Sequence, residues 1–423
     1  MQKKIRVLFL QTSADPWSPE KVHRLLLQNF DQERIEMHMA CAIDQGGAKT
    51  PAYTMFEDVP GLHLRPTNFG KANIGNNSKV AKAKSLLATG LAAPGTLIGL
   101  TNYVKRHHID VIQVHEKARD VSISFFLSKM TGAKTVVYLH VRCASWMRPA
   151  HLRAIRQADG IIGVSAFTAD SAIAIGCQPE KVYHSLNSVD PNQWDYRMDG
   201  SLIRKEFHIP PDTLVFTIVG RTLPWKGHEL LLQALAQIKD YLPDFRLMIV
   251  GDVSAEFILS HGSYISHLQE QVRNLGLSQQ VIFTGMRSDV PMLLAASDLY
   301  TMPTFEEPCA LAILEAMAMK KATVALDNGG PRELVEHGKS GLLSQPDDVQ
   351  QLAENILTLA NDPHLRKQMG EYARRRVEEY FNPQRQANEI EQIYRCVLTG
   401  RHAPDNQAAS GVGVSQMDTV APL

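Results

Sequence analysis

The feature that most constrains this 423-residue chain is an alternation of strands and helices that occurs twice. Five short apolar runs recur in each half, and stretches of helical character separate them. Runs this short and continuous are typical of strands buried on both faces, and their alternation with helices favours parallel sheets. The runs are 5–10, 35–40, 111–114, 135–139 and 160–164, then 214–219, 245–250, 281–284, 299–302 and 323–326. The sequence therefore predicts an α/β protein with two doubly wound parallel sheets.

The domain limits are predicted where this alternation of strands and helices stops. Alternation stops near residue 190 and restarts after 209–212, where Pro210 and Pro211 suit a linker. We expect a first domain over 1–195 and a second over 205–382. Small and polar residues dominate the tail, 401–423, and predict disorder there.

Composition excludes several classes of protein. Lys plus Arg and Asp plus Glu both number 44, which argues against a general nucleic-acid-binding protein. The five cysteines are scattered and form no CxxC pair, so we expect reduced thiols, a cytoplasmic location and no structural zinc site. The apolar run in MQKKIRVLFLQTS is too short for a signal peptide and predicts a buried strand instead.

Residues 85–104 are largely apolar and need a separate assessment. Gly90, Pro94 and Gly95 interrupt the segment, which disfavours a membrane-spanning helix. A helix packed on the first sheet is the favoured interpretation. A helix that touches a membrane surface through its basic flanks is the alternative.

Polar side chains follow several of the predicted strands, at the edge where parallel sheets bind ligands. Each alone is most simply a helix cap or a turn. They are His115, His140, Ser165, Arg221 and Asp252.

The segment GRTLPWKG, residues 220–227, gives the second half a candidate anion site. Gly220 ends a predicted strand, Arg221 and Lys226 follow, and HELLLQALAQI then predicts a helix. Two cations near a helix N-terminus attract phosphate, because the free amides and the helix dipole add to their charge. A solvated basic loop is the alternative.

Two carboxylates, Glu307 and Glu315, occur in TFEEPCALAILEAMA. Pro308 predicts a helix start, which would place the carboxylates about 12 Å apart along one helix and within about 80° of each other. One carboxylate for each sugar of a nucleotide-sugar, with the diphosphate between, would explain this spacing. Alternatively, the dipole favours Glu307 at the helix start and Glu315 pairs with a neighbouring base.

A third segment, DNGGPRELVEHGKSGLL at 327–343, follows the last predicted strand. Gly329 and Gly330 permit a close backbone approach or positive φ, and Pro331 suits the first turn of a helix. Taken alone, the segment predicts only a loop-to-helix turn.

Together these three segments resemble the family 4 retaining glycosyltransferases of GT-B fold, known as glycosyltransferase group 1. The segment 158–190 also resembles the end of that family's first domain, with NSVD in place of NGVD, and the resemblance covers roughly 105–395. It implies two Rossmann-like domains that face each other across a donor/acceptor cleft. It also implies that a last helix, about 383–400, returns to the first domain.

The resemblance implies roles for individual residues. Arg221 and Lys226 would hold the donor diphosphate, Glu307 the transferred sugar and Glu315 the ribose. His140 would lie near the transferred sugar. The remaining donor-site residues would be Gly220, Cys309, Ala310 and Leu311, the latter two through their backbone amides.

The reaction that the resemblance implies retains anomeric configuration and needs neither metal nor cofactor. Its donor would be a UDP- or GDP-linked sugar, and its acceptor a glycan, a lipid-linked glycan or a small metabolite, as in polysaccharide biosynthesis. No nucleic-acid partner is expected. Contact with the inner membrane surface through the first domain is left open.

Three departures from the family pattern keep alternatives open. One is the Gly-rich segment after MIVG, which is altered to GDVSAEFILSHGSYI with extra residues. No glycine follows the first strand in QTSADPWSPEKVHRLL, and Cys309 and Ala310 replace the usual Phe-Gly. If position 310 requires positive φ, alanine would alter the donor site. A non-catalytic nucleotide-sugar-binding protein and a GT-B nucleotide-sugar epimerase are therefore the alternatives. An NAD-dependent oxidoreductase is disfavoured because no GxGxxG opens either half.

Overall fold

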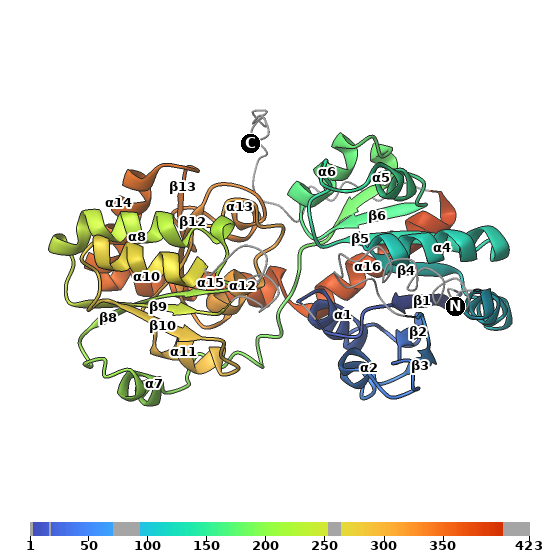
Figure 1. Ribbon diagram of the computed structural model, residues 1–423, viewed down its shortest axis with the longest axis horizontal. Helices are drawn as coiled ribbons and strands as arrows, with labels where there is room; N and C mark the ends of the chain where they lie inside the picture. The colour runs from blue at the N-terminus through green and yellow to red at the C-terminus, as the bar shows by residue number, and fades with distance from the viewer. Residues whose placement is uncertain (1–2, 17, 71–93, 253–263, 401–423) are drawn as a thin grey trace, which may run out of the picture. The chain divides into compact units, whose positions relative to one another are not determined.

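The computed structural model describes residues 3–16, 18–70, 94–252 and 264–400 (Figure 1). The described residues up to Asn187 and from Pro383 onward form one compact unit, here unit 1, and Ser188–Asn382 supply unit 2. The predicted tail at 401–423 lies outside the described residues, as do residues 85–93 of the apolar segment.

Unit 1 is built on a parallel sheet with strand order β3-β2-β1-β4-β5-β6-β7. Its strands are β1 (Ile5–Gln11), β2 (Ile35–Ala42), β3 (Leu62–Thr67), β4 (Val111–His115), β5 (Lys134–Leu139), β6 (Gly160–Gly163) and β7 (Val182–His184). Its helices include α1 (Ser18–Gln28), α2 (Pro51–Phe56), α4 (Ala118–Thr131), α5 (Pro149–Arg156), α6 (Ala166–Ala174) and α16 (Pro383–Thr399). A short 3₁₀ turn, Pro179–Lys181, precedes β7.

The last helix, α16, is held in unit 1 by buried polar contacts. Tyr394 on α16 donates its hydroxyl to the Gln113 side chain at 2.5 Å, and the Gln386 amide donates to the Tyr138 hydroxyl at 3.1 Å. These bonds satisfy polar groups that burial would otherwise leave unpaired.

Residues 94–106, which contain the described part of the apolar segment, form a helix. Leu100 and Val104 are fully buried in the core of unit 1, beside residues such as Ile112. The described part therefore packs on the first sheet, which was the favoured interpretation. Of the helices in the described ranges, none is long and apolar enough to cross a membrane.

Unit 2 has a second parallel sheet, with strand order β10-β9-β8-β11-β12-β13. Its strands are β8 (Leu214–Val219), β9 (Phe245–Val250), β10 (Val281–Gly285), β11 (Leu299–Met302), β12 (Ala322–Leu326) and β13 (Gly341–Ser344). Its helices include α7 (Ser201–Glu206), α8 (His228–Ile238), α10 (Tyr264–Asn274), α11 (Val290–Ala296), α12 (Leu311–Ala318), α13 (Pro331–Leu334), α14 (Val349–Asn361) and α15 (Pro363–Tyr380). Two 3₁₀ turns, Pro224–Lys226 and Lys239–Tyr241, flank α8.

Both sheets have the Rossmann-like order in which the third, second and first strands precede the fourth and fifth. The prediction of two doubly wound parallel sheets is therefore confirmed. All ten predicted strands are present, and helices cover both faces of each sheet (Figure 1). The topological switch point lies between β1 and β4 in unit 1 and between β8 and β11 in unit 2.

Three strands were not predicted: β3, β7 and β13. The edge strand β3, LHLRPT, is half-exposed and carries Pro66, so it lacks a continuous apolar run. The other two are only three and four residues long. Such strands gain their order from a neighbouring strand rather than from their own composition.

Candidate active site

The carboxyl edge of the unit 2 sheet brings together the three segments that the sequence singled out. The segment 220–227 follows β8, 303–310 follows β11, and 327–330 follows β12. These three strands are neighbours in the sheet, so the loops that follow them share one edge. Ligands of open parallel sheets bind at this edge, at the switch point.

The loop after β8 is locked to the loop after β11 through its backbone. The carbonyl of Trp225 accepts from the Phe305 amide at 3.0 Å and from the Thr304 hydroxyl at 3.1 Å. Gly227 has φ +75° between the 3₁₀ turn and α8, and a Cβ there would lie 1.8 Å from the Pro303 carbonyl oxygen. Only glycine fits, so position 227 fixes how closely the two loops approach.

The loop after β12 is locked to the other side of the same β11 loop. The amide of Gly330 donates to the Glu307 carbonyl at 2.8 Å, and the Asn328 side chain donates to the Phe305 carbonyl. A Cβ at Gly330 would lie 2.2 Å from the Pro308 carbonyl oxygen. The Gly-Gly pair therefore serves a close approach between two loops of the protein, and Pro331 opens α13 as predicted.

These contacts place the ammonium group of Lys226 against the carboxylate of Glu307, and the two form an ion pair. Both side chains are largely buried, with 13% and 15% of their surface exposed. A pair so shielded from solvent interacts more strongly than a surface pair, and each partner compensates the buried charge of the other. The sequence predicted both residues for the donor site but not that they would pair.

Arg221 differs from Lys226 because its side chain is exposed. Its side chain forms no hydrogen bond or ion pair with another described residue. Gly220 precedes it, and the Gly220 carbonyl oxygen packs where a Cβ of Gly251 would stand, at 1.9 Å. Arg221 therefore offers a guanidinium group to solvent directly after β8.

The predicted start of the helix after Glu307 was wrong. The helix α12 begins at Leu311 with Ala310 as its N-cap, three residues after Pro308. The cause is the Glu307 carbonyl, which accepts from Gly330 instead of from the next turn of a helix. Glu307 thus lies in a loop, and the helical distance and angle predicted between Glu307 and Glu315 do not apply.

Position 310 does not require a glycine in this structure. Ala310 has φ −72° and ψ 94°, which alanine adopts without strain. Cys309 and Ala310 are both buried, and Leu311 is half-buried.

Glu315 lies on α12, half-buried, on the side of Tyr300. Burial, followed by the charge of Glu315, raises the pKa of Tyr300 well above its usual value. The Tyr300 hydroxyl donates to the Val219 carbonyl at 3.4 Å, at the end of β8. Glu315 thus lies near Tyr300, close to the ends of strands β8 and β11.

His140 belongs to unit 1 and follows β5 directly. Its amide donates to the Glu116 carboxylate at 3.0 Å, and its Nε2 is buried without a partner among the described residues. Burial, followed by the charges of His23 and Lys117, holds the pKa of His140 well below its usual range. The ring is therefore neutral at neutral pH.

Two further histidines surround His140. Ring centroids lie 5.1 Å apart between His140 and His115 and 5.5 Å apart between His140 and His23. Both nitrogens of His115 are buried without a partner among the described residues, and His115 is 1% exposed. Burial lowers the pKa of His23 to about 4. The sequence singled out His115 but missed His23, a buried polar residue on α1.

Charged residues complete this carboxyl edge of unit 1, and sequence reasoning missed them as well. Lys117 donates to the buried Glu20 at 3.0 Å and to Ser13 at 2.7 Å. The Thr12 hydroxyl donates to Asp120, whose pKa burial raises to about 7. These bonds join the loop after β1 to the loop after β4 at the switch point of unit 1. No local motif marks them, because they depend on that convergence.

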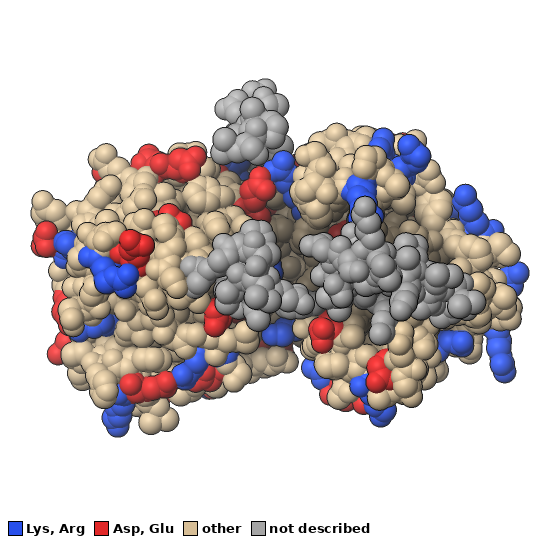
Figure 2. Space-filling view, in the orientation of Figure 1, with Lys and Arg blue, Asp and Glu red and all other residues tan. Residues whose placement is uncertain are grey.

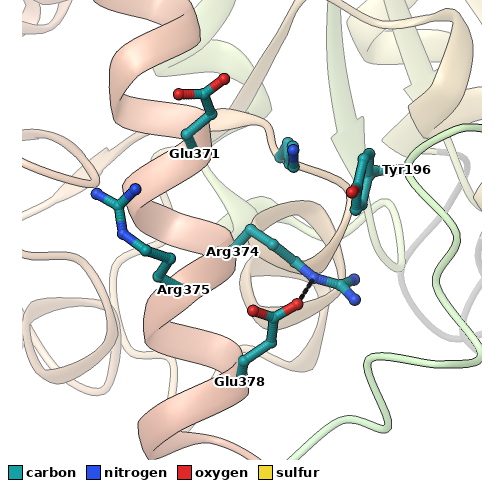
Figure 3. Close-up of a pocket in the computed structure, with 6 residues that line it drawn as sticks. Tyr196, Glu371, Arg374, Arg375 and Glu378 are labelled. Atoms are coloured by element: carbon teal, nitrogen blue, oxygen red, sulfur yellow. Dashed lines mark hydrogen bonds and ion pairs between the residues drawn. The ribbon is translucent and has the colours of Figure 1, made fainter.

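A pocket of about 190 Å³ on unit 2 lies apart from the predicted site residues (Figure 3). It is lined by Tyr196, Lys320, Glu371, Arg374, Arg375 and Glu378. Arg374 donates to the carbonyls of Trp194 and Ala318 at 2.9 and 2.8 Å, and to Glu378 at 2.6 Å. Its charge is therefore used to hold residues 194–196 on α15, and we read the pocket as a packing feature.

The structure thus brings Lys226 together with Glu307 and places eight of the nine predicted site residues on unit 2. His140 lies on unit 1 with a separate set of neighbours.

Comparison with known proteins matches both halves of the chain to glycosyltransferase families. Residues 200–376 match the glycosyl transferases group 1 model, and residues 63–193 match the glycosyltransferase family 4 model. The chain is 26% identical over 307 residues to the N-acetyl-alpha-D-glucosaminyl L-malate synthase of Bacillus anthracis, covering 71% of this chain and 78% of that protein. It is 32% identical over 210 residues to the D-inositol 3-phosphate glycosyltransferase of Corynebacterium jeikeium, covering 49% of each.

Solved structures share the fold. The Anabaena protein HepE in complex with UDP and glucose superposes with a TM-score of 0.72 and 24% identity, over 91% of this chain and 98% of that one. A glycosyltransferase from Rickettsia africae gives a TM-score of 0.76 and 19% identity, over 94% and 99%. The two family matches, the relatives and the paired Rossmann-like sheets agree, and the chain belongs to the GT-B glycosyltransferases of group 1, family 4.

Proposed function

We propose that the protein transfers a sugar from a nucleoside-diphosphate sugar with retention of anomeric configuration, and that unit 2 binds the donor. The observation that carries this proposal is the Lys226–Glu307 pair, held at the switch point by two glycine-dependent loop contacts. A sugar diphosphate presents an anion beside hydroxyl groups. A cation fixed beside a carboxylate complements both.

The pair has capacity left for a ligand. Lys226 has three N–H donors and Glu307 has two oxygens, while their bond uses one of each. Lys226, together with the exposed Arg221, would hold the diphosphate and stabilise the charge that develops on the leaving nucleotide. Glu307 would accept hydrogen bonds from the transferred sugar. Two cations in this role make a divalent ion unnecessary, so we propose a metal-independent reaction.

The other predicted residues take supporting parts in this proposal. Glu315 would accept from the ribose hydroxyls, and the amides of Ala310 and Leu311, the first of α12, would face the donor. Gly220 and Cys309 would shape the two loops. His140, neutral and with an unpartnered Nε2 among the described residues, would bond a hydroxyl of the transferred sugar.

A panel of nucleotide-sugars tests the donor site. Melting of the wild-type protein is measured with UDP-, GDP- and ADP-sugars, since UDP and GDP are the expected carriers. A ligand at about 100 times its dissociation constant adds roughly 2.7 kcal/mol of stability. We expect a shift with one nucleotide that is lost in Arg221→Ala, an exposed position that does not support the fold. No shift with any nucleotide-sugar would contradict the proposal.

Separate experiments identify the acceptor. Relatives are named for acceptors as different as L-malate and inositol 3-phosphate, so small metabolites are tested beside glycans. The anomeric configuration of the product, read by NMR, distinguishes retention from inversion. Full activity after treatment with EDTA would agree with the metal-independent reaction, and loss of activity that Mg²⁺ restores would contradict it.

We propose further that unit 1 makes peripheral contact with an anionic membrane surface. Residues 121–158 contain no Asp or Glu, and six basic residues, namely Lys129, Lys134, Arg142, Arg148, Arg153 and Arg156, of which Lys134 is paired with Asp159. Separate basic side chains lie near α4 and α5 (Figure 2), and Trp146 is 68% exposed in the same stretch. Basic residues with an exposed aromatic anchor favour anionic lipid. Sedimentation with anionic but not neutral vesicles is expected, and equal sedimentation with both would contradict it.

A further inference from the structure

A second group of histidines lies in unit 1 at the opposite end of the strands from His140. His38 on β2 is paired in register with His63 on β3. Glu36 precedes His38 by two residues on β2. Side chains two apart on a strand, and those of residues paired across strands, face the same side of a sheet. Glu36, His38 and His63 therefore lie on one face.

The three side chains are close enough to contact one bound ion. Glu36 Oε1 lies 3.0 Å from His38 Nε2, and the rings of His38 and His63 have centroids 4.7 Å apart. One ligand atom from each residue lies within 4.8 Å of the other two. The ring of His107, which follows helix 94–106, is centred 5.1 Å from that of His38.

Neighbouring side chains orient this group. The hydroxyl of Tyr103 bonds His38 Nδ1 at 2.8 Å, which turns Nε2 toward Glu36. Arg6 contacts the other oxygen of Glu36 at 3.4 Å, which leaves Oε1 on the side of the histidines. Metal-binding histidines commonly have their second nitrogen held in this way.

Solvent reaches this group of side chains from one side. His38 is 1% exposed, whereas His63 is exposed and Glu36 is partly exposed. An ion could therefore reach His38, the buried member of the set, from the side of Glu36 and His63.

We propose that Glu36, His38 and His63 bind a divalent transition-metal ion, with Zn²⁺ as the representative ion and His107 or water as a fourth ligand. Imidazole nitrogen and carboxylate oxygen are ligands that Zn²⁺ accepts, at about 2.0–2.2 Å. The side chains would draw closer as the ion binds.

The three-histidine group of the candidate active site is a weaker choice for this role. Its three members are all histidines, so an ion bound there would have no negatively charged ligand among them. The proposed site supplies such a ligand in Glu36. An ion bound there would join the edge strand β3 to β2, and we infer a role in stabilising that edge of unit 1, separate from sugar transfer.

Zinc binding to the full-length, metal-free protein tests the proposal by equilibrium dialysis. We expect one tightly bound equivalent in the wild type. His63→Ala should weaken binding by more than about tenfold, because it removes a ligand from an exposed position where the fold is not at risk. Tyr103→Phe should weaken binding by about tenfold, as loss of a ligand-orienting contact does. Co²⁺ in place of Zn²⁺ should give a visible absorption spectrum that His63→Ala abolishes.

Two control variants locate the site. His364→Ala removes an exposed histidine of unit 2, and His115→Gln removes a member of the other histidine group; both should retain the bound zinc. Circular dichroism checks that every variant is folded. Absence of zinc binding by the wild type, retention of zinc by His63→Ala, or its loss in His115→Gln would each overturn the proposal.

Discussion

The two units share a strand order at their switch points, but they place different chemistry there. In unit 2 the carboxyl edge carries charged groups, with Arg221 exposed and Lys226 paired to Glu307. In unit 1 the corresponding edge carries buried histidines, whose lowered pKa values keep the rings neutral, beside the Lys117–Glu20 ion pair. The first set suits an anion, and the second suits hydrogen bonds to uncharged hydroxyl groups. One fold thus supports both functions, because the loops, not the sheet, carry the chemistry.

The largest effect that would test this contrast is expected from Lys226→Ala. Loss of a cation that stabilises developing charge should cut sugar transfer by more than about tenfold. The variant should also lose stability, on the order of 1–3 kcal/mol, because Glu307 stays largely buried without its partner. Transfer kinetics and urea unfolding measure the two effects. Near-wild-type turnover would remove Lys226 from the catalytic site.

The double variant Lys226→Ala/Glu307→Ala separates these effects. It removes both charges, so it should recover much of the stability but none of the activity. Recovery of activity with stability would mean that the pair serves only the fold.

The neutral histidines of unit 1 predict a pH dependence with a definite sign. His23 has a folded pKa of about 4 against 6.5 ordinarily, so the unfolded chain binds the proton more tightly. The free energy of unfolding should therefore fall as pH falls from 6.5 to about 4. His23→Gln should flatten this slope by up to about 1.4 kcal/mol per pH unit.

Asp120 provides a matched test of the opposite sign. Its pKa is raised to about 7, so the folded chain binds the proton more tightly and its contribution to stability is lost as pH rises from 3.8 toward 7. Asp120→Asn should therefore steepen the slope that His23→Gln flattens. Urea unfolding at several pH values measures both. Equal slopes in the wild type and both variants would contradict the assignment of buried, neutral histidines to unit 1.

The sequence predicts the two sheets far better than it predicts the site. Continuous apolar runs such as LVFTIV identify a strand without knowledge of its neighbours. The pairing of Lys226 with Glu307 joins residues 81 positions apart and depends on close contacts at Gly227 and Gly330. The start of α12 at Leu311 depends on the same contacts. Local propensity at Pro308 could not reveal them.

Dependence on contacts between distant residues also explains why sequence analysis missed Glu20 and His23 in unit 1. Glu20 and His23 are polar residues on the buried side of α1, and no spacing marks them. They acquire partners only when the loops after β1, β4 and β5 meet. Resemblance to a family assigns His140 a role, but its histidine neighbours are apparent only in three dimensions.

A smaller effect is expected from Glu315→Gln. The glutamine keeps the size and one acceptor oxygen but removes the charge, so hydrogen bonds to ribose hydroxyls weaken. Donor affinity should fall several-fold, on the order of 1 kcal/mol, while the rate at saturating donor changes less. Isothermal titration and steady-state kinetics distinguish the two. Unchanged affinity would assign Glu315 to packing beside Tyr300.

The smallest effect is expected from Ala310→Gly. This variant tests whether the donor loop of unit 2 needs a backbone conformation that alanine disfavours. Ala310 has φ −72°, so glycine would relieve no strain. It lies at the N-cap of α12, where glycine is tolerated better than alanine, and the loss of one buried methyl group offsets that gain. Stability should change by less than about 1 kcal/mol and kcat/KM by less than about twofold, well inside the tenfold effect of Lys226→Ala. A large rise in kcat/KM would instead mean that the loop takes positive φ when donor binds. The contrast between the units would then rest partly on a mobile donor loop in unit 2, and not only on the charges that its two glycine contacts hold in place.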